Sequence, residues 1–432
     1  MSALLERIGA RGGVSPRRAL TFGFIFLGAG LLIFLLFALA SSAGQVTTFV
    51  LDPSGATNAI PVPPLRFPTL PALYAFAVFC AFLGGWQLAR GFERINLVLG
   101  VVAVVFILSF LTWAARGGSL NFTGLLGSSL LRAVPIALAA LSGVICERCA
   151  VINIAIEGMM LTGAFTSALM GSIAVNVWMW PSWLGMIFGL LAGILSGGVL
   201  GLLLAVLAVR FKIDQIIAGT AINILGTGIT SFLSARILAE FQQLNNPGIF
   251  PKISIPLLSK IPVIGPVFFE QNPLVYTLFI LMTLVHIILF FTRWGLRTRA
   301  VGEHPRAADT LGINVFKNRY INVTVGGMVA GLGGAFLILG SVGRFDELMT
   351  AGKGFIGLAA MIFGKWMPFG AFGAALIFGF ADALQTKLAI LEVPVPSQFL
   401  LMAPYLVTMI VLAGVVGEAV PPAADGEPYE KQ

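Results

Sequence analysis

The chain has 432 residues, of which 58% are hydrophobic and only 10% are charged, and its mean hydropathy is +0.97. A water-soluble domain of this length needs more charge, so the composition excludes a soluble globular enzyme and indicates an integral membrane protein. The net charge is +8, but the basic residues lie between the apolar segments, as in membrane proteins, which argues against nucleic-acid binding.

The chain consists of long apolar runs separated by short polar segments. A bilayer core about 30 Å thick requires about 20 apolar residues per helix, and the alternation over about 10 residues that marks a barrel strand is absent. The predicted fold class is therefore all-α, a polytopic membrane bundle of about 10 to 12 transmembrane helices. The predicted spans are 20–42, 71–89, 96–115, 128–146, 150–174, 183–209, 215–238, 273–292, 320–342, 367–388 and 398–416, and a shorter apolar piece, 354–365, crosses or re-enters.

The first span follows four arginines and ends near Ala38-Leu39-Ala40, which resembles a signal-peptidase site. Its length exceeds the 7 to 15 residues, roughly, of a signal h-region, so we expect an uncleaved helix. The N-terminus is then inside, because most Lys and Arg residues fall on the inner side. We expect an N-terminal transmembrane extension of about three helices (1–115), a core (116–420) and a C-terminal tail (421–432).

Glycines recur at every fourth position in the span 183–209. Spacing of four places them on one helical face, where small residues let two helix backbones approach closely in lipid. We predict a packing seam there, and a second one in the span 320–342. The seams consist of Gly185, Gly189, Gly193, Gly197 and Gly201, and of Gly327, Gly331 and Gly334.

Catalytic and metal-binding motifs are missing. Cys146 and Cys149 form a C-E-R-C pair, but no second pair or neighbouring histidine completes a site, so we expect them and Cys80 to be packing residues and expect no metal. The sequence has no H-E-x-x-H and no G-x-S-x-G, and A-M-I-F-G-K-W at 360–366 lacks the P-loop spacing. We therefore expect no enzymatic activity and no cofactor in this chain.

Polar residues within the apolar spans are the stronger functional signal. A charge at mid-bilayer costs about 2.5 to 3.5 kcal/mol, so it tends to face water or a partner. Asn153 and Glu157 are four residues apart, which in a helical span 150–174 places them on one face, and Gly158 lets a neighbour come close. They line a solute pathway; the alternatives are that they only form hydrogen bonds between helices or that Glu157 is protonated. Asn223, Asn322 and Asp382 are further candidates.

The loop 293–320 contains G-E-H-P-R-A-A-D-T-L-G-I-N-V. Pro305 suits a first helical position and Gly312 the position past the end, which predicts a helix of about seven residues. Its small apolar face is Ala307, Ala308 and Leu311. Charged residues (Glu303, Arg306 and Asp309) surround this face. Such a helix suits docking into another protein's groove; the alternative is a helix lying on lipid headgroups.

Four segments resemble the permease subunits of ATP-binding-cassette importers for nucleosides and simple sugars, which are related to ribose and branched-chain amino-acid permeases. They are ERCAVINIAIEGMMLTGAF, RTRAVGEHPRAADTLGINV, AGKGFIGLAAMIFGKWMPFGA and PPAADGEPYEKQ, in the family order from about residue 125 to the end. Cys149 departs from the small residue expected there. The resemblance implies a multi-pass protein of the bacterial inner membrane, working by alternating access.

The resemblance also implies partners and sites. The partners are a second permease, expected to be a related chain, a cytoplasmic ATPase with two cassettes that uses ATP and Mg²⁺, and an extracytoplasmic solute-binding protein. The segment from Asn153 to Gly158 would lie by the pathway, with Asn223 hydrogen-bonding a sugar or base and with Phe345 and Phe355 offering a stacking wall. ATPase coupling would fall to Glu303, His304, Pro305, Arg306, Ala307, Ala308, Asp309, Leu311 and Gly312.

Two other functions remain open from the residues alone. An ion-coupled secondary transporter would use Glu157 and Asp382 as proton relays. It would transport its solute without an ATPase. An intramembrane hydrolase or a structural scaffold has little support, because the sequence offers neither a nucleophile and base pair nor a reason for the capped helix at Pro305.

Overall fold

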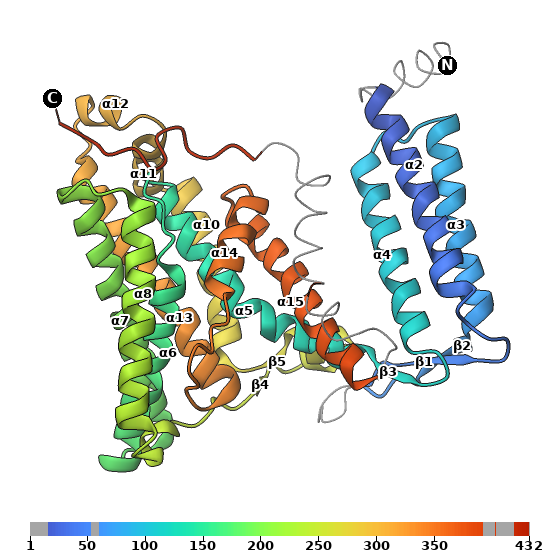
Figure 1. Cartoon of the computed structure of the whole chain (residues 1–432), viewed down its shortest axis with the longest axis horizontal. Coiled ribbons are helices and arrows are strands. Elements are labelled where there is room, and N and C mark those ends of the chain that lie inside the picture. The colour runs from blue at the N-terminus through green and yellow to red at the C-terminus, as the bar shows by residue number, and fades with distance from the viewer. Residues whose placement is uncertain (1–15, 53–59, 392–401, 403–418, 432) are drawn as a thin grey trace. The chain divides into compact units, whose positions relative to one another are not determined.

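The structure, a computed structural model, describes residues 16–52, 60–391, 402 and 419–431 (Figure 1). Within these residues ten helices are long and apolar enough to cross a membrane, which confirms the predicted polytopic helical bundle. The predicted span 398–416 lies outside the described residues. The chain forms two compact units: Met1–Gly124 with Lys260–Ile264 and Thr386–Ser397, and the remainder, Leu125–Ser259, Gly265–Gln385 and Gln398–Gln432.

The first unit packs three helices and a small sheet. The helices approach closely at glycines, since a Cβ on Gly30 would lie 2.8 Å from the Ala77 carbonyl oxygen. Its sheet has the strand order β2-β1-β3, with β1 antiparallel to β2 and parallel to β3. The elements are α2 (Pro16–Leu32) with its π-helical end η1 (Ile33–Ala38), β1 (Val46–Val50), β2 (Leu65–Pro68), α3 (Thr69–Ala89), α4 (Ile95–Ala114) and β3 (Ser119–Asn121).

The second unit holds the long helices of the core, several of which end in a π-helical turn. Side-chain caps set their starts: Asp214, Asn272 and Asn314 each accept backbone N–H groups of the following helix. These helices are α5 (Phe122–Glu147), α6 (Ile156–Ser172) with η2 (Ile173–Val177), α7 (Ser182–Ala205) with η3 (Val206–Arg210), α8 (Gln215–Leu233) with η4 (Ser234–Leu238), α10 (Pro273–Phe291), α13 (Val315–Leu337) with η7 (Ile338–Val342) and α15 (Pro368–Ile390).

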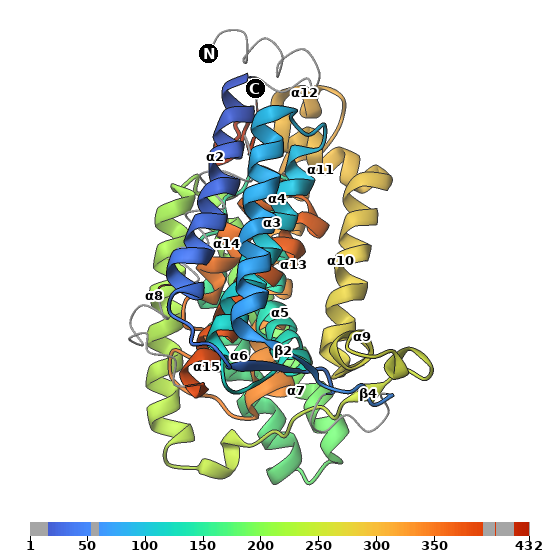
Figure 2. The same cartoon turned by 90° about the vertical axis from the view of Figure 1, so that its right-hand side faces the viewer.

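Shorter elements connect the long helices of this unit. Figure 2 shows α10 with α9 and β4 near one end and α11 near the other. The strands β4 and β5 pair antiparallel, with Ile253 opposite Gln271. The short elements are η5 (Gln242–Asn245), β4 (Ile253–Ser254), η6 (Leu258–Lys260), α9 (Ile264–Phe268), β5 (Glu270–Gln271), α11 (Arg293–Glu303), α12 (Pro305–Thr310) and α14 (Lys353–Phe363).

Glycines bring the backbones of α6, α7 and α13 into contact. A Cβ on Gly193 would lie 2.7 Å from the Gly163 carbonyl oxygen of α6, and a Cβ on Gly197 would lie 2.7 Å from the Gly331 Cα of α13. A Cβ on Gly201 would meet the α13 backbone in the same way. No larger side chain fits without separating the helices. The Gly-rich packing predicted from the sequence is therefore present.

Two details differ from the predicted spans. Helix α6 begins at Ile156 and not at residue 150, because the chain leaves α5 at Glu147 and passes through a non-helical linker in which Ala150 has a φ of +64°. The short apolar piece is α14, whose 11 residues extend about 16 Å, too little to cross a bilayer core alone. Cys80, Cys146 and Cys149 are free and buried.

Candidate functional site

Two charged residues bind the backbone around α14: Glu157, in the first turn of α6, and Arg148, in the linker between α5 and α6. The Glu157 carboxylate accepts backbone N–H groups at its start, from Gly352 at 2.8 Å and from Gly354 at 2.6 Å. In the turn that follows α14, the Arg148 guanidinium donates two hydrogen bonds to the Trp366 carbonyl oxygen, at 3.0 and 3.1 Å. A helix is partly positive at its N-terminus and partly negative at its C-terminus. The negative charge of Glu157 therefore matches the α14 dipole.

This arrangement gives the half-buried Glu157 a structural partner. The fit is close, because a Cβ on Gly354 would lie 2.7 Å from Glu157 Oε2. A carboxylate that accepts two backbone N–H groups satisfies donors that a helix start otherwise leaves unpaired. A capping role thus explains the acidic residue in this apolar segment, and its place on a solute pathway stays a prediction.

Asn153 does not share a helical face with Glu157, which corrects the geometry expected from their spacing. It lies in the linker before α6, so the four-residue periodicity of a helix does not apply to it. Its side chain is fully buried, and its Nδ2 donates to Ser142 Oγ at 3.4 Å and contacts Cys146 Sγ at 3.4 Å. Asn153 therefore ties the linker to α5.

Asn223, on α8, joins that helix to the start of α6. Its Oδ1 accepts the Gly158 N–H at 2.7 Å, and its Nδ2 donates to the Ile154 carbonyl oxygen at 2.8 Å. Gly158 permits this approach, since a Cβ there would lie 2.8 Å from the Ile222 carbonyl oxygen. The structure thus brings Glu157, Gly158 and Asn223 together around the start of α6.

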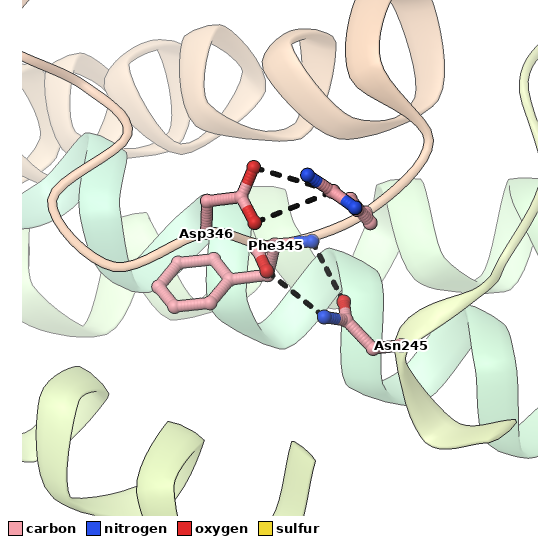
Figure 3. Close-up of polar contacts among 4 residues, drawn as sticks. Asn245, Phe345 and Asp346 are labelled. Carbon is pink, nitrogen blue, oxygen red and sulfur yellow. Dashed lines mark hydrogen bonds and ion pairs between the residues drawn. The ribbon is translucent and has the colours of Figure 1, made fainter. Parts of the chain in front are cut away.

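The two predicted stacking residues have different surroundings. Phe345 is 2% exposed and packs edge to face on Phe165, with ring centroids 5.3 Å apart. Its backbone is bridged by Asn245, which accepts the Phe345 N–H at 2.7 Å and donates to its carbonyl at 2.9 Å, as Figure 3 shows with Asp346 beside it. Phe355 is 48% exposed. Phe345 is thus a core residue that fixes the loop before α14.

The helix predicted in the loop 293–320 is α12, joined to α11 at His304 (Figure 1). His304 Nδ1 accepts the Ala307 N–H at 3.5 Å, and Pro305 occupies the first helical position. Gly312, with a φ of +82°, follows the helix end. The sequence signals for the start and the end of this helix are therefore both used.

The apolar residues of α12 face two ways. Ala308 is 2% exposed and packs into the core, whereas Ala307 is exposed and Leu311, just past the helix, is 82% exposed. Glu303 and Arg306 are exposed on the same segment, and Asp309 is half-buried. Leu311 is thus an exposed apolar side chain with charged neighbours. The expected apolar face of three residues does not form, because Ala308 faces the core while Ala307 and Leu311 face outward.

The described residues 419–431, which include most of the predicted tail (421–432) and are called the tail below, lie against this hairpin and the start of α13. The Ala424 N–H donates to the Gly302 carbonyl at 3.0 Å, and Tyr429, 6% exposed, packs on Phe316 with ring centroids 5.4 Å apart. A groove of about 360 Å³ separates the tail from α12. Three further contacts hold the tail: Ala423 N–H to Glu303 Oε2, Arg319 Nη1 to the Glu427 carbonyl, and Lys212 to Glu430.

One carboxyl of the tail, that of the half-buried Asp425, lies beside the buried carboxyl of Glu147. Asp425 forms a hydrogen bond with Glu147, whose Oε2 also accepts the Trp366 indole N–H at 2.6 Å. Burial raises the pKa of Asp425 to about 6, although the bond to Glu147, the Gly426 N–H and the positive charge of Arg319 oppose the rise. The tail therefore contains a group that titrates close to neutral pH.

A cavity of about 480 Å³ opens within the second unit. Its walls come from α5, the end of α13 with η7, the loop before α14, the first residue of α14 and α15. Arg132 of α5 and Asp382 of α15 form an ion pair across it, with 2.8 Å between Nη1 and Oδ2. The sequence analysis marks Asp382 but not Arg132, although a charged residue within a predicted span, here the fifth residue of 128–146, was the available signal.

The comparisons with known proteins agree with this architecture. Residues 125–416 match the family described as branched-chain amino acid transport system / permease component. The chain is 43% identical to the guanosine ABC transporter permease protein NupQ of Bacillus subtilis over 70% of its own length and 95% of that protein. It is 41% identical to the nucleoside ABC transporter permease protein NupC of Lactococcus lactis, over 71% of its length and 96% of that protein.

A more distant relative is a putative glucose ABC transporter permease protein of Haloferax volcanii, 34% identical over 61% of the chain and 77% of that protein. No solved structure gives a significant match. The ion-coupled alternative finds no support among these relatives, and Asp382 is engaged by Arg132. The chain therefore belongs to the branched-chain amino acid transport system permease family and is a multi-pass membrane subunit of an ABC transporter.

Proposed function

We propose that this permease imports nucleosides or related simple sugars across the bacterial inner membrane by alternating access. The observation that carries the proposal is the identity of 43% and 41% to two permeases named for guanosine and nucleoside transport, over nearly their whole lengths. Identity at this level over a whole subunit supports a common solute class more strongly than a shared fold does.

The energy source is a separate cytoplasmic ATPase with two cassettes, which binds the ATP and Mg²⁺. Its docking site is the α11–α12 hairpin, where Leu311 offers an apolar anchor with charged neighbours. The hairpin, the tail and the N-terminus then lie inside the cell. A second, related permease completes the pathway, and an extracytoplasmic binding protein delivers the solute. The predicted pathway residues Asn153, Glu157, Gly158 and Asn223 lie near the start of α6.

The solute class is tested by uptake. The chain and its genomic neighbours for the ATPase, the second permease and the binding protein are expressed in cells that lack their own nucleoside transport. We expect saturable, ATP-dependent uptake of labelled guanosine that requires this chain. Uptake of glucose but not of guanosine would overturn the assignment.

The coupling site is tested by placing a charge at Leu311, its exposed apolar residue. Leu311→Asp should abolish uptake and ATPase binding without changing the melting temperature of the chain, because this side chain is 82% exposed. Val420→Asp is the matched control, since Val420 is 76% exposed on the tail. Normal uptake in the Leu311 variant would remove α12 from the interface.

A further inference from the structure

We propose that the cavity between α5, α13, α14 and α15 is a binding site for the hydroxyl groups of a neutral sugar moiety, such as the ribose of a nucleoside. This inference rests on the proposed function. The volume of about 480 Å³ lies within the range, about 300 to 1,000 Å³, of sites for small ligands.

The charges that line this cavity balance. Arg132 and Lys353 are cationic, and Asp346 and Asp382 are anionic. Charged side chains within membrane helices are tolerated when they pair or face water, and Arg132 and Asp382 do pair. Because the lining has two positive and two negative side chains, the cavity has no net charge that would favour a cation or an anion. These side chains offer both strong donors and strong acceptors to an uncharged ligand.

Three backbone irregularities meet at the same cavity. Pro135, inside α5, has no N–H to donate to the Leu131 carbonyl, and both residues line the cavity. Ser341 belongs to the π-helical turn η7, and Lys353 is the first residue of the short helix α14. π-Turns and broken helices recur at functional sites of membrane transporters, because they expose backbone groups and helix ends to a ligand.

The carboxylate of Asp346 is positioned by residues that pack outside the cavity. Asn245 bridges the backbone of Phe345 (Figure 3), and Phe345 is buried against Phe165. These contacts hold the next residue, Asp346, which lines the cavity. The ion pair of Asp346 with Arg344, at 3.3 Å, is exposed to solvent and contributes little to the energy of the fold. Asp346 is thus available to accept hydroxyl groups.

The chemistry favours a polyol with an apolar portion. Adjacent hydroxyls donate to Asp346 and Asp382 and accept from Arg132 and Lys353, while Ser128 and Ser341 supply further hydroxyls. The apolar side chains of Val342, which is exposed, and Met349, which is half-buried, line the same cavity and offer a surface to a less polar group such as a base. A sugar without vicinal hydroxyls leaves these charged groups unmatched, which costs affinity.

The test measures protection of an introduced cysteine in membranes containing the full complex. Ser341→Cys places a thiol at the cavity, and the native cysteines are buried, so a charged methanethiosulfonate reagent reports mainly on this position. Guanosine at ten times its dissociation constant should slow labelling about tenfold, because about one site in ten stays empty. The analogue 2′,3′-dideoxyguanosine should protect much less.

Matched variants separate binding from folding. Adding Asp346→Asn to the Ser341→Cys chain should remove protection by guanosine, whereas adding Glu347→Gln should not, because Glu347 is exposed and lies outside the cavity lining. Ser128→Cys serves as a second reporter if Ser341→Cys does not accumulate in membranes. Glu347→Cys should label at the same rate with and without guanosine.

The outcomes distinguish this inference from the proposed function. Guanosine uptake by the complex together with an unprotected thiol at both reporter positions overturns the site while the solute assignment stands. Equal protection by guanosine and its dideoxy analogue overturns hydroxyl recognition. If the wild-type complex takes up no nucleoside, the proposed function fails, and the site assigned to that solute fails with it.

Discussion

Glu157 and Gly354, 197 positions apart in the chain, are joined by a hydrogen bond of 2.6 Å from the Gly354 N–H to the carboxylate. Arg148, nine residues before Glu157, binds the turn that follows the same helix, α14, at the Trp366 carbonyl. Glu157, in the first turn of α6, thus binds the start of α14, and Arg148, in the linker before α6, binds the turn after it. A short helix that cannot cross the membrane alone has a charged contact at its start and another just past its end.

Removing the cap should destabilise the chain. Glu157→Ala leaves two backbone N–H groups at the start of α14 without their acceptor, and losing a hydrogen bond to a charged group costs about 1.5 to 3 kcal/mol. We expect a lower melting temperature of the purified chain in detergent. It is measured with a thiol-reactive dye, because the three native cysteines are buried until the chain unfolds.

Glu157→Gln provides the graded comparison, since its amide oxygen still accepts one of the two N–H groups, and it should melt between the wild type and the alanine variant. Glu347→Gln, an exposed change in the preceding loop, should melt as the wild type does. Equal melting temperatures for wild type and Glu157→Ala would show that α14 does not depend on this carboxylate.

Adding a methyl group at the glycine contact between α7 and α13 should also lower the stability of the fold. In Gly197→Ala the new methyl group would lie 2.7 Å from the Gly331 Cα, so the helices must separate. Overpacking of this kind costs about 1 to 3 kcal/mol. The control is Gly228→Ala on α8, where a Cβ meets nothing within 4 Å and the higher helix propensity of alanine adds up to about 1 kcal/mol. Thermal melting that moves the same way in both variants would contradict this account.

The tail should restrain the α11–α12 hairpin. Tyr429→Ala removes a buried ring that packs on Phe316, and truncations of buried aromatic residues cost about 3 kcal/mol or more. We expect backbone amides of α12 to exchange with deuterium up to about a hundredfold faster, as measured by mass spectrometry. Lys431→Ala, at an exposed position, should leave exchange unchanged. Slow exchange in the tyrosine variant would mean that α12 is stable without the tail.

The tail should be bound more stably to the rest of the chain at acidic pH than at neutral pH. The pKa of Asp425 is raised from 3.8 to about 6 in the folded chain, so the folded form binds a proton more strongly than the unfolded form does. Its contribution to stability is full below about pH 4 and is lost as the pH rises through about 6. Exchange protection factors of the tail amides, which correct for the intrinsic effect of pH, should fall between pH 5 and pH 7.5.

Asp425→Asn is the matching control, because an uncharged amide resembles the protonated carboxyl. Its tail should stay protected at pH 7.5 and lose the pH dependence. A variant that keeps the wild-type pH dependence would assign the titration to another group, with the neighbouring Glu147 as the first candidate.

The helices were predictable from the sequence because each one is marked by its own run of apolar residues. Most predicted spans in the described residues begin and end within a few positions of the observed helices, since apolar length alone defines a membrane crossing. The start of α6 was missed because the linker before it is also apolar: Val151, Ile152 and Ala155 read as helix by hydropathy. The break becomes visible only in the backbone, at Ala150.

The candidate sites were less predictable because their parts are distant in sequence. The sequence marks Glu157 as unusual but cannot show that its partners are backbone amides near residue 353. The cavity draws its charges from residues as far apart as Arg132 and Asp382. By contrast, α12 was predicted closely, since Pro305 and Gly312 act on their immediate neighbours. What sequence could not supply is which side of that helix faces the core.

The glycine seams limit how this protein can move. Backbones in van der Waals contact along several turns have no side chains whose rotamers could absorb sliding or tilting, so α6, α7 and α13 are expected to travel as one rigid block. A transport cycle must then hinge elsewhere. Among the parts that can shift against that block are α5, with its interior proline, and α15, which enclose the cavity together with the start of α14 and the end of α13.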